Sequence, residues 1–138
     1  MTQNETVILI KRKVKTFAYH ADSFYRDKGS KRNNYVNTDT EHNLSRDIKK
    51  FYKQRYYLFS KYDRGVKIDE ESWYSVTPEI IAKHIANKIN ENYGQDNSNV
   101  LDGFCGVGGN LIQFGKKCGF TVGVDLDRVK SEYALHNA

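Results

Sequence analysis

The stretch that decides the fold runs from Asn99 to Asp125 and reads NVLDGFCGVGGNLIQFGKKCGFTVGVD. It begins with a short apolar strand at Val100-Leu101 and ends with a second strand over Thr121–Asp125. Between the two strands lie a glycine-rich loop and a segment with helical spacing that Gly119 ends. Strand, loop, helix and strand in this order predict an α/β fold that opens a doubly wound parallel sheet.

Helices are predicted on both sides of this stretch. A helix over 127–138 is indicated by the spacing of Val129, Tyr133 and Ala134, which we expect to face inward. Upstream, Thr77-Pro78-Glu79 is typical of a helix start, with the threonine hydroxyl as cap and the proline at the first helical position. Isoleucines at four-residue steps continue this helix, and Gly94 is expected to end it.

A further helix is predicted from about residue 43 to Gly65. It has an apolar stripe rich in aromatic side chains and a separate face of cationic side chains. The stripe contains Leu44, Ile48, Phe51, Tyr52, Phe59 and Tyr62. The basic face contains Arg46, Lys49, Lys50, Lys53 and Arg55. The order of these elements predicts three regions: a basic, flexible tail over 1–43, a helical lobe over 44–76 and a partial Rossmann-like domain over 77–138.

Composition excludes several classes of protein. The chain has 138 residues, and its longest apolar run, Val7-Ile8-Leu9-Ile10, is far shorter than the ~20 residues of a membrane-spanning helix. Two cysteines cannot build a disulfide framework, which favours a reducing compartment. A hydrophobic content of 38% excludes a fully disordered chain.

The charge is distributed unevenly along the chain. Residues 1–67 contain 16 Lys and Arg against 7 Asp and Glu, and residues 68–138 contain 6 against 10. The basic half also holds 11 of the 18 aromatic residues. A basic, aromatic-rich segment indicates contact with a polyanion, and a solvated basic surface is the alternative. The cluster Lys11–Lys15 is similarly open to two interpretations, a nuclear-import signal or part of the polyanion-binding face.

The glycine loop indicates a nucleotide-type cofactor. Dinucleotide-binding loops read G-x-G-x-x-G, but here Leu111 stands at the third glycine position. Asp102 ends the first strand, where a carboxylate would repel a pyrophosphate and suit the ammonium group of S-adenosylmethionine. Asp125, at the end of the second strand, can accept hydrogen bonds from ribose hydroxyls. Gly106 and Gly108 would let the backbone approach the cofactor. A dinucleotide and a purely structural glycine turn remain the alternatives.

Other reactive side chains form no recognisable site. Cys105 and Cys118 have no histidine pair near them in the sequence, so we expect no metal. Cys105 is interpreted as a small residue packed in the loop rather than as a nucleophile. The four histidines are scattered along the chain.

Several motifs together resemble trimethylguanosine synthases. They are KFYKQRYYLFS at 50–60, WYSVTPE at 73–79 and DGFCGVGGN at 102–110, and the resemblance covers about residues 48–138. It implies S-adenosylmethionine-dependent methylation of the N2 amine of 7-methylguanosine caps on small nuclear and nucleolar RNAs. It further implies capped RNA and ribonucleoprotein proteins as partners, no membrane, and a location in the nucleus or nucleolus, with the cytoplasm as a further compartment.

The resemblance also implies roles for individual residues. Asp102 corresponds to the acid that binds the methionyl amine, and Asp125 to the acid that binds the ribose. The remaining cofactor-binding residues would be Phe59, Thr77, Pro78, Cys105, Gly106, Gly108 and Asn110. Lys50 corresponds to a lysine that faces the phosphates of the cap.

One motif of the family has no counterpart in this sequence. The family's methyl-transfer step depends on a loop reading S-P-P-W-G-G-P, but the single proline and single tryptophan here are Pro78 and Trp73. No catalytic residue is therefore assigned, and we expect the chain to be the N-terminal portion of a longer enzyme, inactive alone. A non-catalytic capped-RNA-binding module and another S-adenosylmethionine-dependent RNA methyltransferase are the alternative functions.

Overall fold

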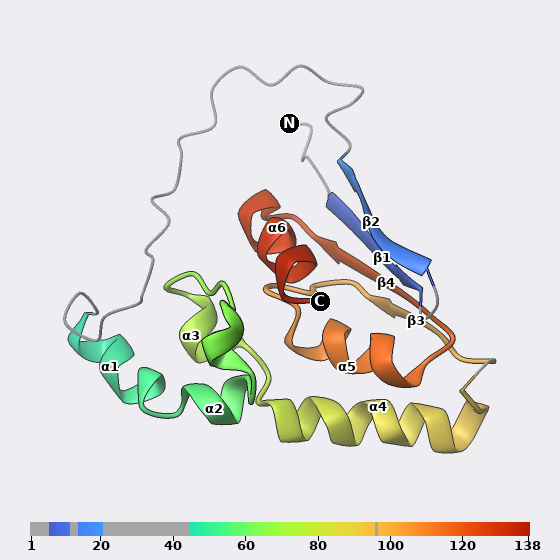
Figure 1. Ribbon diagram of the computed structural model, residues 1–138, viewed down its shortest axis with the longest axis horizontal. Coiled ribbons are helices and arrows are strands. Elements are labelled where there is room, and N and C mark those ends of the chain that lie inside the picture. Colours follow the sequence, from blue (N-terminus) through green and yellow to red (C-terminus); the bar gives the residue numbers. More distant parts are fainter. Residues whose placement is uncertain (1–5, 12–13, 21–44, 96) are drawn as a thin grey trace.

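The computed structural model describes residues 6–11, 14–20, 45–95 and 97–138. The strands are β1 (Thr6–Lys11), β2 (Val14–His20), β3 (Asn99–Asp102) and β4 (Phe120–Asp125). The helices are α1 (Arg46–Tyr52), α2 (Arg55–Leu58), the 3₁₀ turn η3 (Tyr62–Arg64), α3 (Ser72–Ser75), α4 (Glu79–Tyr93), α5 (Gly109–Lys117) and α6 (Arg128–Asn137). Figure 1 shows the sheet with α4, α5 and α6 on one side of it and the short helices α1 to α3 beyond one end of α4.

The predicted parallel unit is confirmed. Strands β3 and β4 are parallel, with Asn99 opposite Phe120 and Asp102 opposite Gly123, and α5 connects them. Helix α6 follows β4 and begins at Asp127, whose side chain accepts hydrogen bonds from the amides of Val129 and Lys130. This β-α-β-α order is that of a partial Rossmann-like α/β fold, in which the carboxyl ends of neighbouring strands form the ligand-binding edge.

The sheet is larger than the two strands expected from the sequence. Strand β1 pairs antiparallel with β4, with Thr6 opposite Asp125, and β2 pairs antiparallel with β1. The order is therefore β2-β1-β4-β3 (Figure 1). Strand β1 therefore covers the edge of β4, and part of the segment 1–43 that was predicted to be a tail forms strands. Residues 21–44, and residues 12–13 of the basic cluster, lie outside the described residues.

The single helix predicted from residue 43 to Gly65 is wrong. The chain instead turns twice, after Tyr52 and after Leu58, and forms α1, α2 and η3. Turning lets the apolar stripe surround Trp73, which is 1% exposed and whose ring lies 5.7 Å from those of Tyr52 and Tyr62. Burial of this ring outweighs the continuity of one helix. Gly65 ends η3 at a φ of +89°, as predicted.

Helix α4 has the predicted end but a different start, and its completely buried residues are alanines. Pro78 is its N-cap and Thr77 makes no capping bond, which corrects the prediction of a threonine cap. Ala82 and Ala86 are completely buried, whereas Ile81 and Ile85 are 50% and 38% exposed. The alanines allow α4 to lie close to α5, where Ala86 packs with Phe114 and Cys118 and Ile89 packs against them. None of the described helices is long and apolar enough to cross a membrane.

The helical lobe and the Rossmann-like part share one hydrophobic cluster. Lobe residues including Ile68 and Trp73 pack with Val107 of the glycine loop and Tyr133 of α6. The buried residues of this cluster are Ile48, Leu58, Phe59, Ile68, Trp73, Val107 and Tyr133. The cluster crosses the predicted boundary at residue 76 and holds the lobe against the glycine loop.

Candidate functional site

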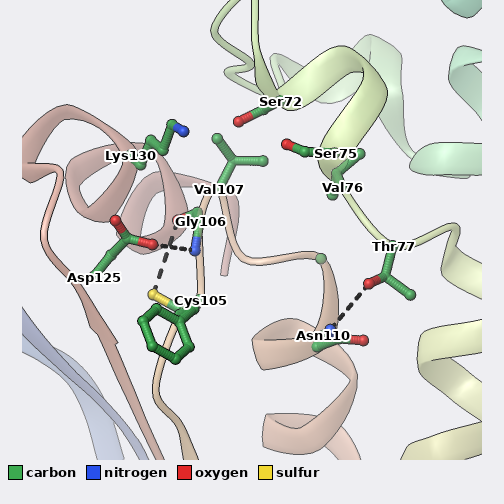
Figure 2. A pocket seen from close by; sticks show the side chains of 12 residues that line it. Ser72, Ser75, Val76, Thr77, Cys105, Gly106, Val107, Asn110, Asp125 and Lys130 are labelled. Atoms are coloured by element: carbon green, nitrogen blue, oxygen red, sulfur yellow. Dashed lines mark hydrogen bonds between the residues drawn. The ribbon is translucent and has the colours of Figure 1, made fainter.

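A cavity of ≈ 200 Å³ opens beside the glycine loop, near the carboxyl ends of β3 and β4. It is lined by Ser72, Ser75, Val76, Thr77, Phe104, Cys105, Gly106, Val107, Gly109, Asn110, Asp125 and Lys130. The lobe supplies one wall and the loop and α6 supply the other (Figure 2). Five residues predicted to bind a cofactor line it: Thr77, Cys105, Gly106, Asn110 and Asp125.

Asp125 fixes the loop from the end of β4. Its Oδ2 accepts a hydrogen bond of 2.8 Å from the amide of Gly106, and its Oδ1 accepts one of 2.9 Å from the amide of Asp127. Figure 2 shows the first of these bonds on the wall of the cavity. Each carboxylate oxygen has a second lone pair. Asp125 can therefore position the loop and still accept hydrogen bonds from a ligand.

A second link joins the two walls. Asn110, in the first turn of α5, donates from Nδ2 to Oγ1 of Thr77 at 3.1 Å (Figure 2). The other amide atom of Asn110, Oδ1, is buried and has no partner among the described residues. A buried acceptor without a partner is costly. Oδ1 of Asn110 is thus a candidate ligand-binding atom.

Asp102 lies at the end of β3 and does not line the cavity itself. Burial raises the pKa of this carboxyl above its ordinary value, and the charge of Asp125 raises it further, against the hydrogen bond from the amide of Phe104. Its Oδ2 is buried without a partner among the described residues. A buried, unpaired carboxylate oxygen is the arrangement in which a cationic ligand group would be most stabilising.

Glycine is required at different positions of the loop for different structural reasons. Gly106 has a φ of +50°, and a Cβ built there would meet nothing within 4 Å, so its side-chain space is open. Gly108 has a φ of +93°, and its Cβ would come within 3.2 Å of Ala134. Gly109 has no room for a side chain either, because a Cβ would lie 2.6 Å from Cγ2 of Val76. Gly108 and Gly109 therefore allow the loop to pack against α6 and the lobe, while Gly106 faces open space.

Cys105 is a buried thiol in the wall of the cavity. Burial first, and then the charges of Asp102 and Asp125, raise its pKa to about 12. The group is therefore protonated at neutral pH and unsuited to nucleophilic attack, in agreement with the interpretation as a packed residue.

Lys130 is the main cavity residue that the sequence did not indicate. Its Nζ lies 2.8 Å from Oε2 of Glu71, and this ion pair joins α6 to the residue before α3. Burial lowers the pKa of Lys130, but the hydrogen bond with Glu71 and the nearby Asp69 outweigh it and the pKa is raised. The two residues are 59 positions apart, so no sequence pattern could have paired them. Ser72, Ser75 and Val76 were missed for the same reason. Phe104, Val107 and Gly109 lie within the predicted glycine loop but were not singled out there.

Other predicted site residues lie outside the cavity lining. Phe59 is 7% exposed in the lobe core, Pro78 caps α4, and Gly108 packs on α6. Lys50 is exposed on α1, with its Nζ 4.8 Å from the centre of the Phe51 ring. Their roles toward a cofactor or substrate stay predictions. Within the part of the chain that is described, no three His, Cys, Asp or Glu side chains gather into a group that could hold a metal ion.

Comparison with known proteins gives matches to one family. Residues 97–138 match the model of the family described as RNA cap guanine-N2 methyltransferase. The chain is 41% identical over 90 residues to the trimethylguanosine synthase of Schizosaccharomyces pombe, which covers 65% of this chain and 36% of that protein. It is 43% identical over 77 residues to the trimethylguanosine synthase of Saccharomyces cerevisiae, which covers 55% of this chain and 24% of that protein.

The chain therefore spans about a third of the length of the first relative and a quarter of the second. The matched family segment contains the glycine loop, Asp102 and Asp125, which also carry the resemblance in the sequence motifs. That resemblance is confirmed: residues 97–138 match the RNA cap guanine-N2 methyltransferase family, and both relatives are trimethylguanosine synthases.

Proposed function

We propose that this chain binds S-adenosylmethionine in the cavity and is the cofactor-binding part of an enzyme that methylates the guanine N2 amine of 7-methylguanosine-capped RNA. The observation that carries the proposal is the position of Asp102 and Asp125 at the ends of two adjoining parallel strands, on either side of the glycine loop. The family match supports the reaction class. S-adenosylmethionine would supply an electrophilic methyl group on a sulfonium.

The described residues fit such a cofactor. Asp125 lines the cavity and has lone pairs left for ribose hydroxyls. Asp102 lies beside the lining at the end of β3, and its unpaired carboxylate would attract the ammonium group. Oδ1 of Asn110 is a third acceptor without a partner, and the open space at Gly106 gives the ligand access to the loop backbone. The chain's contribution would be to bind and orient the ligand in a partly water-excluded cavity.

A dinucleotide fits less well. Leu111, at the third glycine position, is completely buried and packs with Cys105 and Ala134. A Cβ at Gly123 would lie 2.6 Å from Leu111, so the helix and the strand already meet through this leucine. Two carboxylates, Asp102 and Asp125, would also repel a pyrophosphate.

The basic lobe is the proposed site of the RNA cap. Lys50 is exposed on α1, which also carries Arg46 and Lys49. A triphosphate bridge would be attracted by these charges, and its affinity would fall with salt. As in the sequence-based expectation, we propose small nuclear and nucleolar RNAs as substrates, ribonucleoprotein proteins as partners, and the nucleus as the location.

Calorimetric titration of the 138-residue chain with S-adenosylmethionine tests the cofactor assignment. We expect saturable 1:1 binding that Asp102→Asn and Asp125→Ala weaken at least several-fold, with Lys88→Ala as a surface control. NADH is the competing ligand. Tighter binding of NADH than of S-adenosylmethionine would overturn the assignment.

A second experiment tests the reaction. Because the chain alone is expected to be inactive, the longer enzyme that would contain it is incubated with methyl-labelled S-adenosylmethionine and an m7GpppG cap dinucleotide. Label on the guanine N2 is the expected product of the cap methyltransferase. Tight cap binding without transfer would favour the non-catalytic capped-RNA-binding module. Lys50→Ala should lower cap affinity and its salt dependence, and Lys88→Ala, an exposed lysine of α4 outside the lobe, is the control.

A further inference from the structure

A second cleft of ≈ 300 Å³ lies between η3, α5 and the end of α6. Its walls carry four basic side chains: Lys61, Arg64, Lys116 and His136. It shares no lining residue with the cavity at the glycine loop. The two are nevertheless adjacent, because Nδ2 of Asn137, which lines the cleft, donates to the carbonyl of Val107, which lines the cavity.

The basic side chains of this cleft have no acidic side chain beside them among the described residues that line it. Lys83, Lys88, Arg128 and Lys130 each form an ion pair with a glutamate. By contrast, Lys61, Arg64 and Lys116 form no ion pair or side-chain hydrogen bond with any described residue.

The neighbouring positive charges also affect the ionisation of Lys116. Burial lowers the pKa of its ammonium group, and the charges of Lys61 and Lys83 lower it further, against the opposing effect of Glu79. Cations that destabilise one another in the free protein would be stabilised by a bound anion. The cluster of positive charges therefore points to an anionic ligand.

The wall of the cleft is held in a defined shape. Asn137 accepts from the amide of Lys67 at 2.8 Å and donates to the carbonyl of Lys67 at 2.9 Å. Nε2 of His136 lies 2.8 Å from the carbonyl of Gly65. These bonds fix the segment after η3 to the last turn of α6, so the charged side chains rise from a pre-formed surface.

We propose that this cleft binds a backbone phosphate of the RNA substrate, away from the cap itself. The inference rests on the proposed function, because it assumes that the cap lies at the lobe and that the RNA continues past it. RNA is favoured over an acidic protein because Lys and Arg without acidic neighbours match repeated phosphates, and because the cleft adjoins the strongly basic half of the chain. The hydrogen bond between Asn137 of the cleft and Val107 of the cavity places a bound polymer next to the cofactor cavity.

The neighbouring lysines of α5 provide the test. Lys116 lines the cleft, whereas Lys117, also exposed and also in the last turn, does not. Fluorescence anisotropy would measure binding of an uncapped 12-nucleotide RNA to the 138-residue chain carrying Lys116→Ala, Arg64→Ala or Lys117→Ala. We expect about a five-fold or greater decrease in affinity for the first two and less than two-fold for the third. The slope of log affinity against log salt should shrink by about 0.7 for each phosphate of single-stranded RNA that the variant no longer neutralises.

Several results would overturn the proposal. One is an equal decrease in RNA affinity for Lys116→Ala and Lys117→Ala. Another is displacement of the RNA by inorganic phosphate with the same molar affinity as the RNA. The third is a polyglutamate peptide that binds as tightly as the RNA. Lys116→Gln and thermal melting curves separate the effect of charge from an effect on folding. Failure of the proposed function would look different: the unmodified chain would not bind S-adenosylmethionine or the cap dinucleotide, while the RNA measurement would still report on the cleft.

Discussion

Oδ2 of Asp125 accepts a hydrogen bond of 2.8 Å from the backbone amide of Gly106. The carboxylate at the end of β4 thus holds the glycine loop that follows β3, 19 residues earlier in the chain. Because Oδ1 binds the amide of Asp127, one side chain fixes both the loop and the entry to α6. Asp125 is therefore a structural residue of the free protein as well as a candidate ligand-binding residue.

Replacement of Asp125 is expected to affect stability and binding together. Asp125→Ala removes both acceptors and should lower the free energy of unfolding by about 1–3 kcal/mol. Asp125→Asn keeps one acceptor and should retain more stability, while S-adenosylmethionine affinity falls in both variants. Urea unfolding with and without the cofactor measures both effects. Glu132→Gln, an exposed acid on α6, is the control; an unchanged unfolding curve in Asp125→Ala would contradict the structural role.

Asp102→Asn is expected to separate stability from binding. Its carboxyl has a raised pKa and a buried, unpaired oxygen, so the charged form is destabilising in the free protein. The neutral amide should leave the unfolding midpoint unchanged or raise it, while cofactor binding weakens. Because the ammonium ligand requires the ionised carboxylate, binding to the unmodified chain should also decline on acidification at a pH above the ordinary pKa of 3.8. Calorimetry across pH checks this, and a lower stability of Asp102→Asn would contradict it.

Replacing a threonine by valine should change the stability differently at positions 77 and 121. Thr77→Val removes the acceptor for Nδ2 of Asn110 and should cost about 1 kcal/mol of unfolding free energy. Thr121 is completely buried, and its Oγ1 has no partner among the described residues, so Thr121→Val should be neutral or stabilising. Thermal melting of both variants side by side is the measurement, and equal shifts would show that the Asn110 link carries no stability.

Glu79 should make stability depend on pH in the acid range. Burial opposes its ionisation, but hydrogen bonds from Lys83 and Ser60 outweigh burial and lower its pKa to about 2. The folded pKa lies below the ordinary value of 4.5, so the stabilising contribution is complete above about pH 4.5 and is lost as the pH falls toward 2.

Glu79→Gln should therefore lower stability at pH 7 by about 1 kcal/mol and flatten the decline between pH 4.5 and 2. Glu91→Gln, which removes an exposed ion pair with Lys88, is the matched control and should change stability little. Urea unfolding at pH 7, 5, 4 and 3 provides the curve. Parallel curves for Glu79→Gln and the unmodified chain would contradict the assignment.

Local signals in the sequence were sufficient for the second half of the chain. The alternation of strand and helix from Asn99 onward, and the inward positions of Tyr133 and Ala134, were predicted and are present. The glycine loop and the two acids were found because their spacing within one β-α-β unit is a local pattern. Five predicted cofactor residues consequently line the cavity.

The first half could not be predicted in this way, because its contacts are distant in sequence. The helix predicted to Gly65 is broken so that the aromatic residues can surround Trp73. Likewise, Ile81 and Ile85 are exposed because Ala82 and Ala86 allow α4 to approach α5, and this choice depends on the neighbouring helix.

The sequence by itself therefore determined the chemistry of this protein: a glycine loop with an acid at the end of each flanking strand, and a basic, aromatic lobe before it. Tertiary structure alone decided which distant residues lie next to the glycine loop and the lobe. It placed β1 on the edge of β4, paired Lys130 of α6 with Glu71 of the lobe, and left Lys61, Arg64 and Lys116 together around a second cleft. The physical reason is that glycine conformation and strand or helix periodicity are properties of neighbouring residues, whereas strand pairing, ion pairs and charged clefts depend on residues that only the folded chain brings together.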